Sequence, residues 1–230
     1  LAGYDPADPV TARGDDHVPA DGYVSHLDAD GLDGARIGVA RQFFGLHEED
    51  SASEADAAAV TSVVEGALKE MAAAGATIVD PVDVVDVDFL ESARVIEYEF
   101  ARDFDRHLSE LGDAASHDSL ADVYATGELA PPVASRLAES DVLDVDVASL
   151  EENVGYLRRL RRRERLKDTT LSALAERDLD ALVYPPSRVP PVEIPENQPF
   201  PEMNCELAAH TGLPAIVVPA GFTEDGLPVG

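Results

Sequence analysis

An uninterrupted apolar run near the C-terminal end, Ala215 to Val218, constrains the fold more than any other feature of the sequence. Its residues do not alternate between apolar and polar, which is typical of a strand buried on both faces of a parallel sheet. A short helix ending at Gly212 is expected before the run, and Pro219 ends the strand because it cannot donate a ladder hydrogen bond. The Asp225-Gly226 pair then predicts a tight turn. We therefore expect a helix, a buried strand and a hairpin.

The N-terminal half contains a strand, helix and strand in succession. A short apolar strand is expected over 34–40, and apolar residues after Ser53 recur at helical spacing on one face until Gly75. A second strand is expected over 76–79. Short joins between these elements favour a parallel pair within an α/β layer. The remaining sequence predicts helices over 89–111, 119–126, 132–138 and 150–176, and a strand over 178–184.

Acidic residues dominate the charge of the chain. The formal net charge is −29, and only two of the 17 basic residues are lysines. This charge repels nucleic acids and anionic membranes, so neither is an expected partner. The hydrophobic content of 45% argues against disorder, and the excess of Asp and Glu indicates a halophilic, cytoplasmic protein. The arginines within 158–165 are expected to be solvated or internally paired, with at most one directed into a cleft.

No cofactor or metal site is predicted. The sequence contains no phosphate-binding GxxxxGK loop, no GxGxxG after a strand and no HExxH. Its histidines show no metal-ligand spacing. The single cysteine, Cys205, excludes an internal disulfide and is expected to be a small buried residue.

Several segments resemble the amidase signature family. They are the module from Asn204 to Gly230, the opening Gly3-Tyr4-Asp5-Pro6, the strand Ile37-Gly38-Val39 and the helical Tyr98-Glu99-Phe100. The resemblance implies α/β/α layers around a mixed sheet, here an incomplete amidase signature fold. Residues 1–230 are then expected to form the C-terminal part of one amidase domain, with 1–33 as an N-terminal connecting loop. Because the chain begins with Leu and ends within a turn motif, we expect a piece of a longer polypeptide.

The resemblance also implies an activity, the hydrolysis of a small-molecule carboxamide to carboxylate and ammonia by a Ser-Ser-Lys triad. The family carries that triad in a Gly- and Ser-rich segment that would precede Gly3, and no such segment occurs in these residues. This chain is therefore expected to hold no catalytic residue and to be inactive alone. By position, the resemblance places Glu202, Met203 and Asn204 at the substrate cleft, with Tyr98 as a further candidate. Helix capping by Asn204 and core packing by Met203 remain open.

Two alternative functions remain open. Within the family, the A subunit of a glutamyl- or aspartyl-tRNA amidotransferase would need partner subunits, although the segment from Asn204 to Thr211 looks more like the stand-alone amidases. Outside it, the chain would be a truncated and inert binding or scaffold protein. An incomplete sheet would expose strand edges and apolar faces, so we expect marginal stability or association into a homo-oligomer.

Overall fold

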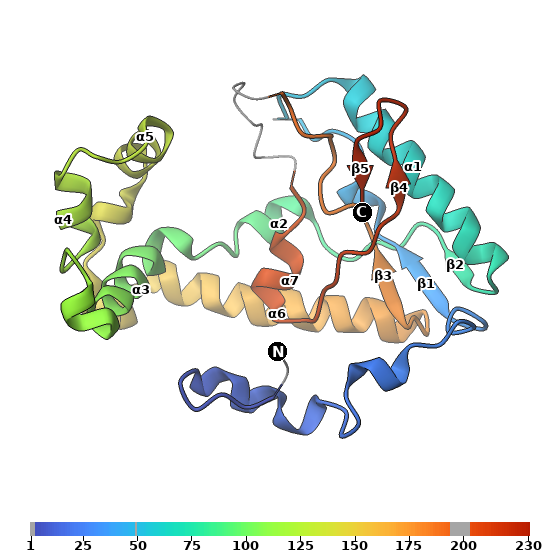
Figure 1. Cartoon of the computed structure of the whole chain (residues 1–230), viewed down its shortest axis with the longest axis horizontal. Helices are drawn as coiled ribbons and strands as arrows, with labels where there is room; N and C mark the ends of the chain where they lie inside the picture. Colours follow the sequence, from blue (N-terminus) through green and yellow to red (C-terminus); the bar gives the residue numbers. More distant parts are fainter. Residues whose placement is uncertain (1–2, 49, 194–202) are drawn as a thin grey trace.

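A computed structural model describes residues 3–48, 50–193 and 203–230. Three parallel strands form the central sheet in the order β2-β1-β3, namely β1 (Arg36–Val39), β2 (Thr77–Val79) and β3 (Ala181–Val183). The helices α1 (Glu54–Ala73) and α6 (Val154–Glu176) run along the sheet (Figure 1). The predicted α/β class is confirmed. The expected parallel pair is also present, with Ile37 opposite Ile78.

Helix α1 begins and ends where its sequence dictates. The Ser53 hydroxyl accepts a hydrogen bond from the Asp56 N–H at 3.2 Å, and the Asp56 carboxylate accepts from the Ser53 N–H, which forms a capping box. Its apolar face is buried, with Val60, Val64 and Leu68 in the core. The helix stops before Gly75, which has a φ of 103° and lies where a Cβ would come within 3.0 Å of Asp33. Only glycine fits that turn without strain.

The prediction of one helix over 89–111 is wrong, because the chain breaks over residues 92–95. Two helices result, α2 (Val87–Glu91) and α3 (Ile96–Leu111). The break leaves backbone carbonyls without helical partners, and α6 supplies donors for them. The guanidinium groups donate at 2.9–3.1 Å, Arg162 to Ser92 O, Arg163 to Ala93 O and Arg159 to Arg94 O. This part of the arginine-rich helix is thus paired with backbone rather than with carboxylates.

Helices α3, α4 (Leu120–Ala125) and α5 (Pro131–Glu139) form an arm beside the sheet-containing body (Figure 1). The long helix α6 begins at Val154 rather than near Leu150, because residues 147–152 form a 3-10 turn. The Asn153 side chain caps this helix by accepting a hydrogen bond from Tyr156 N–H at 3.1 Å. Other 3-10 turns are η1 (Pro9–His17), η2 (Tyr23–His26), η3 (Arg41–Phe43), η4 (Gly112–Ala114) and η5 (Asp141–Asp144).

The C-terminal module contains α7 (Glu206–Thr211) and a hairpin of β4 (Gly221–Phe222) and β5 (Pro228–Val229). The predicted hairpin is confirmed, and Gly226 has the positive φ of 79° that its turn needs. The predicted buried strand over 215–218 is wrong. The Ile216 and Val217 residues are 86% and 67% exposed, because no strand among the described residues pairs with this run.

The parallel and antiparallel pairings expected in one mixed sheet therefore occupy two separate sheets.

The main core packs the carboxyl ends of the parallel strands against the helices. Its buried side chains come from the loop after β1, the segment after β2 and helices α2, α6 and α7, namely Ala40, Phe43, Val82, Val84, Leu90, Leu166 and Leu207. Within the described residues, every helix is too short or too polar to span a bilayer.

Candidate substrate-binding site

The candidate site lies beyond the carboxyl ends of β1 and β3. In open α/β sheets this edge is where ligands usually bind, since the loops that follow the strands converge there. Here the loop after β1, the Pro-rich segment after β3 and the residues before α7 meet. The predicted site residues Met203 and Asn204 both lie at this junction, where Met203 forms an isolated antiparallel bridge with Ser187.

The Asn204 side chain ties these loops together. Its amide nitrogen donates to Phe43 O and to Pro185 O, both at 2.8 Å. Its amide oxygen accepts from Arg188 Nη1 at 3.0 Å. The residue is buried, with 8% exposed. Since Cys205 is the N-cap residue of α7 and its side chain makes no cap bond, the proposed capping role of Asn204 is wrong.

Arg188 extends this network to a buried carboxylate. Its Nη2 donates to both oxygens of Asp50 at 2.7 and 2.8 Å, in a pair whose side chains are 4% and 2% exposed. Burial raises the pKa of Asp50, but hydrogen bonds from Arg188 and from the His47 N–H outweigh it, so the pKa lies below its usual range. We call Asp50, Arg188 and Asn204 the Asn204 clamp.

The clamp joins segments that precede α1, follow β3 and precede α7. A buried ion pair adds little net stability, because desolvation offsets attraction, but removing one partner leaves an expensive buried charge. The Asn204 amide is therefore bound to Phe43, Pro185 and Arg188 in the interior rather than open to solvent.

The other predicted site residues lie in different surroundings. Met203 is 45% exposed, which excludes full core packing. Tyr98 belongs to a second cluster, where its ring lies 5.7 Å from that of Tyr156 and 5.4 Å from the Arg159 guanidinium carbon. The structure thus brings Met203 and Asn204 together, but it holds Tyr98 in the packing between α3 and α6. Glu202 lies outside the described residues.

A small pocket of about 270 Å³ opens beside Met203. Its wall combines one residue of α1, the segment after β3, Met203 and the C-terminal strand β5. The lining is mostly apolar and includes Val60, Pro186, Ser187, Val189, Met203 and Val229. The Ser187 hydroxyl, the polar side-chain group of this lining, donates to Val189 O at 2.8 Å. We call this cavity the Met203 pocket.

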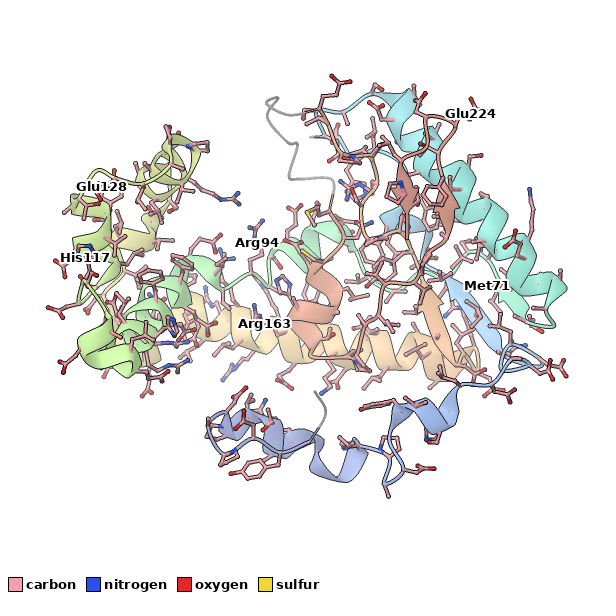
Figure 2. The ribbon with its side chains drawn as sticks, viewed as in Figure 1. Met71, Arg94, His117, Glu128, Arg163 and Glu224 are labelled. Carbon is pink, nitrogen blue, oxygen red and sulfur yellow. The ribbon has the colours of Figure 1, made fainter. Side chains whose placement is uncertain are left out.

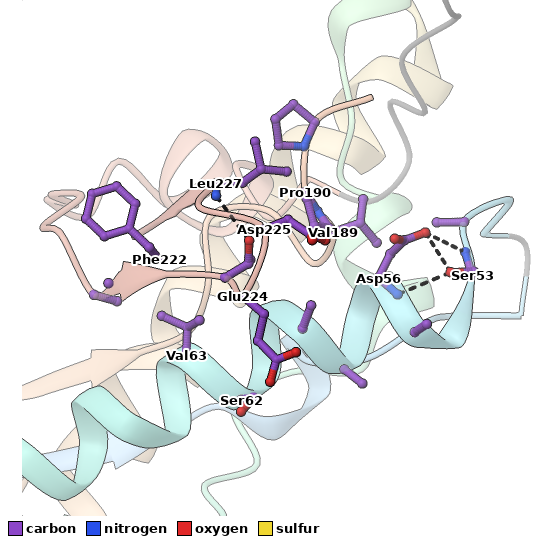
Figure 3. A pocket seen from close by; sticks show the side chains of 18 of the residues that line it. Ser53, Asp56, Ser62, Val63, Val189, Pro190, Phe222, Glu224, Asp225 and Leu227 are labelled. Atoms are coloured by element: carbon purple, nitrogen blue, oxygen red, sulfur yellow. Dashed lines mark hydrogen bonds between the residues drawn. The ribbon is translucent and has the colours of Figure 1, made fainter. Parts of the chain in front are cut away.

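A larger groove of about 1320 Å³ separates α1 from the β4–β5 hairpin (Figure 3). Small residues of α1 form its floor and carboxylates lie around it, with Glu224 extending from the hairpin turn toward Ser62 of α1. Two hydroxyl groups that line it make hydrogen bonds to nearby residues. The Ser53 hydroxyl bonds with Asp56, and the Thr223 hydroxyl accepts from Leu227 N–H. Within the described residues, the groove therefore offers space but no arrangement of a nucleophile and a base.

Charged groups lie around α7. Arg94 Nη1 lies 3.5 Å from Glu206 Oε1, and Figure 2 shows Arg94 and Arg163 beside this helix. Burial raises the pKa of Glu206. Burial and then the Arg163 charge lower the pKa of His210 to about 4. The His210 Nδ1 is buried and has no hydrogen-bond partner among the described residues, so a neutral imidazole is the form that this environment favours.

Sequence reasoning missed the Asn204 clamp. Arg188 stands alone in the apolar Pro185-Pro186-Ser187-Arg188-Val189 segment directly after a strand, and a single cation in such a segment is a signal of a buried pair. Asp50 gives no comparable signal, since it is one of 46 acidic residues. The prediction that Cys205 is buried is wrong, since this residue is exposed.

The chemistry available within the described residues is limited. Their hydroxyls serve largely as helix caps and loop contacts, as at Ser119 with Asp122 N–H. Both lysines are exposed. No group of three or more His, Cys, Asp or Glu in the described part of the chain is placed to hold a metal ion. The described residues offer cavities between loops rather than a complete reaction centre.

Comparison with known proteins shows the family. The family described as Amidase matches residues 1–230. The chain belongs to the amidase family. The predicted resemblance to amidase signature enzymes is confirmed.

Two curated relatives of this amidase chain are glutamyl-tRNA(Gln) amidotransferase A subunits. The one from Caldanaerobacter subterraneus subsp. tengcongensis is 28% identical over 258 residues, covering 100% of this chain and 46% of that protein. The one from Myxococcus xanthus is 30% identical over 231 residues, covering 93% and 43%. The chain thus spans less than half the length of these relatives.

Solved structures share the fold. PAM12A superposes with a TM-score of 0.66 at 27% identity, covering 100% of this chain and 45% of that one. An amidase family protein from Bacillus anthracis str. Ames gives 0.63 at 23% identity, covering 99% and 39%. A bacterial aryl acylamidase of the amidase signature family gives 0.59 at 18%, covering 99% and 44%. The last two comparisons support the fold alone.

Proposed function

We propose that the polypeptide containing this chain hydrolyses the C–N bond of a carboxamide to carboxylate and ammonia. The family match over residues 1–230 carries this proposal. The chain would supply the scaffold and the substrate-facing wall at the carboxyl ends of β1 and β3. Met203 would contact the substrate, and the Asn204 clamp would hold that wall in place.

The reactive groups would come from residues outside this sequence. Amide hydrolysis by a serine nucleophile needs a neutral base within hydrogen-bond reach of the hydroxyl. The Ser187 hydroxyl already donates to Val189 O, and the exposed Lys69 and Lys167 lack the burial that would lower a lysine pKa. The nucleophilic serine and the lysine base would therefore lie in a Gly- and Ser-rich segment that these residues do not contain.

Ammonia release tests the proposal. The intact polypeptide should release ammonia from a primary amide, with loss of activity on treatment with a serine-directed sulfonyl fluoride. The 230-residue chain assayed alone should release none. Turnover by the chain alone that disappears in Ser187→Ala or Cys205→Ala would refute our placement of the reactive groups. No turnover by the intact polypeptide would favour an inert scaffold.

A second candidate function is that of an amidotransferase A subunit. Its support is that both curated relatives are glutamyl-tRNA(Gln) amidotransferase A subunits. Such a subunit would release ammonia from glutamine and would need partner subunits to pass it on. Purified without partners, an amidase should hydrolyse simple amides at full rate. An amidotransferase component should instead depend on added partner subunits and prefer glutamine.

A further inference from the structure

The Met203 pocket carries an inference about the substrate, and it rests on the proposed function. The pocket lies where the segment after β3 meets Met203, at the edge of the sheet where α/β proteins bind ligands. Its volume of about 270 Å³ is slightly below the roughly 300–1,000 Å³ typical of drug-sized ligand sites. It suits one small group, such as a branched alkyl chain or a single ring.

The lining selects against charge. Among the described residues, no ionisable side chain contributes to it, and those that do contribute are mainly proline, valine and methionine. The hydroxyl of Ser187 has its donor committed to Val189 O. A carboxylate group that entered this pocket would lose water without gaining a side-chain donor, and an ammonium group would gain only the Ser187 oxygen as a side-chain acceptor, so burial of either charge is strongly unfavourable.

The nearest cation in sequence does not alter this conclusion. Arg188 lies between the lining residues Ser187 and Val189, yet it is only 3% exposed and does not line the pocket. Its Nη atoms are engaged by Asp50 and Asn204. The clamp thus keeps a guanidinium group away from a position where it could recognise a substrate carboxylate.

We propose that the Met203 pocket receives the apolar acyl group of an uncharged amide, so that the enzyme prefers small aliphatic or aromatic amides to amides that carry a carboxylate. Met203 would act here as a specificity-determining residue, in van der Waals contact with the acyl group. Glutamine and other amino acid amides would be poor substrates, because their charged groups would enter an apolar wall.

The test measures kcat/KM of the intact polypeptide for isobutyramide, benzamide, succinamate and glutamine. Isobutyramide or benzamide should exceed both charged amides by at least tenfold. Met203→Lys should lower kcat/KM for the apolar amides at least tenfold and raise succinamate relative to them, whereas Met203→Leu should keep the original order. Met71→Ala, on the far part of α1 (Figure 2), provides a matched methionine control and should leave the order unchanged.

The outcomes separate the two proposals. Hydrolysis that favours succinamate or glutamine overturns the inference and leaves amide hydrolysis intact. An unchanged order in a folded Met203→Lys variant, checked by circular dichroism, also overturns it. Hydrolysis of none of the four amides overturns the proposed function and the inference together.

Discussion

The C-terminal region before the β4–β5 hairpin has two halves that are adjacent in sequence but differ in how this chain holds them. The first half, from Met203 to Thr211, is fixed by the Asn204 clamp and by Leu207 in the main core. The second half, residues 213–219, makes no strand pairing among the described residues and exposes Ile216. Both halves carry the same family resemblance, so resemblance alone does not distinguish a segment that is held from one that is not.

The difference follows from what each half needs. Asn204 satisfies its amide with carbonyl groups and a guanidinium that the described residues themselves supply. An apolar strand needs neighbouring strands for its backbone and cover for both faces, and no described element provides them for 213–219. The clamp should therefore control stability in this chain, while the apolar run should control association.

The largest expected effect comes from breaking the clamp at its charge. Arg188→Met leaves the Asp50 carboxylate buried without its cation, which should cost about 3–5 kcal/mol in the free energy of unfolding. Urea denaturation measures this cost. The double variant Arg188→Met/Asp50→Leu should recover most of the loss, because it removes both charges. A matched control is Arg106→Met, at an exposed pair, which should cost less than about 1 kcal/mol.

A smaller loss should follow substitution of Asn204. In Asn204→Asp the side chain still accepts from Arg188 but no longer donates to Phe43 O and Pro185 O. Leaving those carbonyls unsatisfied should cost about 1–3 kcal/mol in urea denaturation. A loss equal to that of Asn153→Asp, whose side chain only accepts from Tyr156 N–H, would contradict the clamp.

Acid should weaken the region around α7 through His210. Its pKa is about 4 in the folded chain, below the roughly 6.5 of an unfolded chain. The unfolded state therefore binds the proton more readily, and stability should fall as the pH drops from about 6.5 toward 4. Melting temperatures at pH 7.5 and 5.0 measure this. His210→Gln should reduce the difference between the two temperatures, whereas the exposed His117→Gln should not.

The smallest stability effect is expected in the exposed run. Ile216→Ser/Val217→Ser should change the free energy of unfolding by less than about 0.5 kcal/mol, because both side chains already face solvent. The same substitutions should increase the monomer fraction in sedimentation velocity, since they remove an exposed apolar patch. A buried strand would instead lose about 1.5–3 kcal/mol for each side chain, and that result would erase the contrast between the two halves.

Local signals in the sequence predicted the elements that depend on neighbours along the chain. The cap at Ser53 and the turn at Gly75 bound α1, and Gly226 formed the predicted hairpin turn. These features are set by a few adjacent residues, so they can be identified without knowing the rest of the fold.

Tertiary structure decided the rest. The break between α2 and α3 depends on arginines of α6 more than 60 residues away, and Asn204 became a clamp only where Phe43, Pro185 and Arg188 converged on it. The run at 215–218 has the composition of a buried strand, but burial requires partners that composition cannot supply. Hydrogen bonds and burial between distant segments are properties of the assembled chain, and this is why the sequence alone determined the local caps and turns but not the contacts between distant segments.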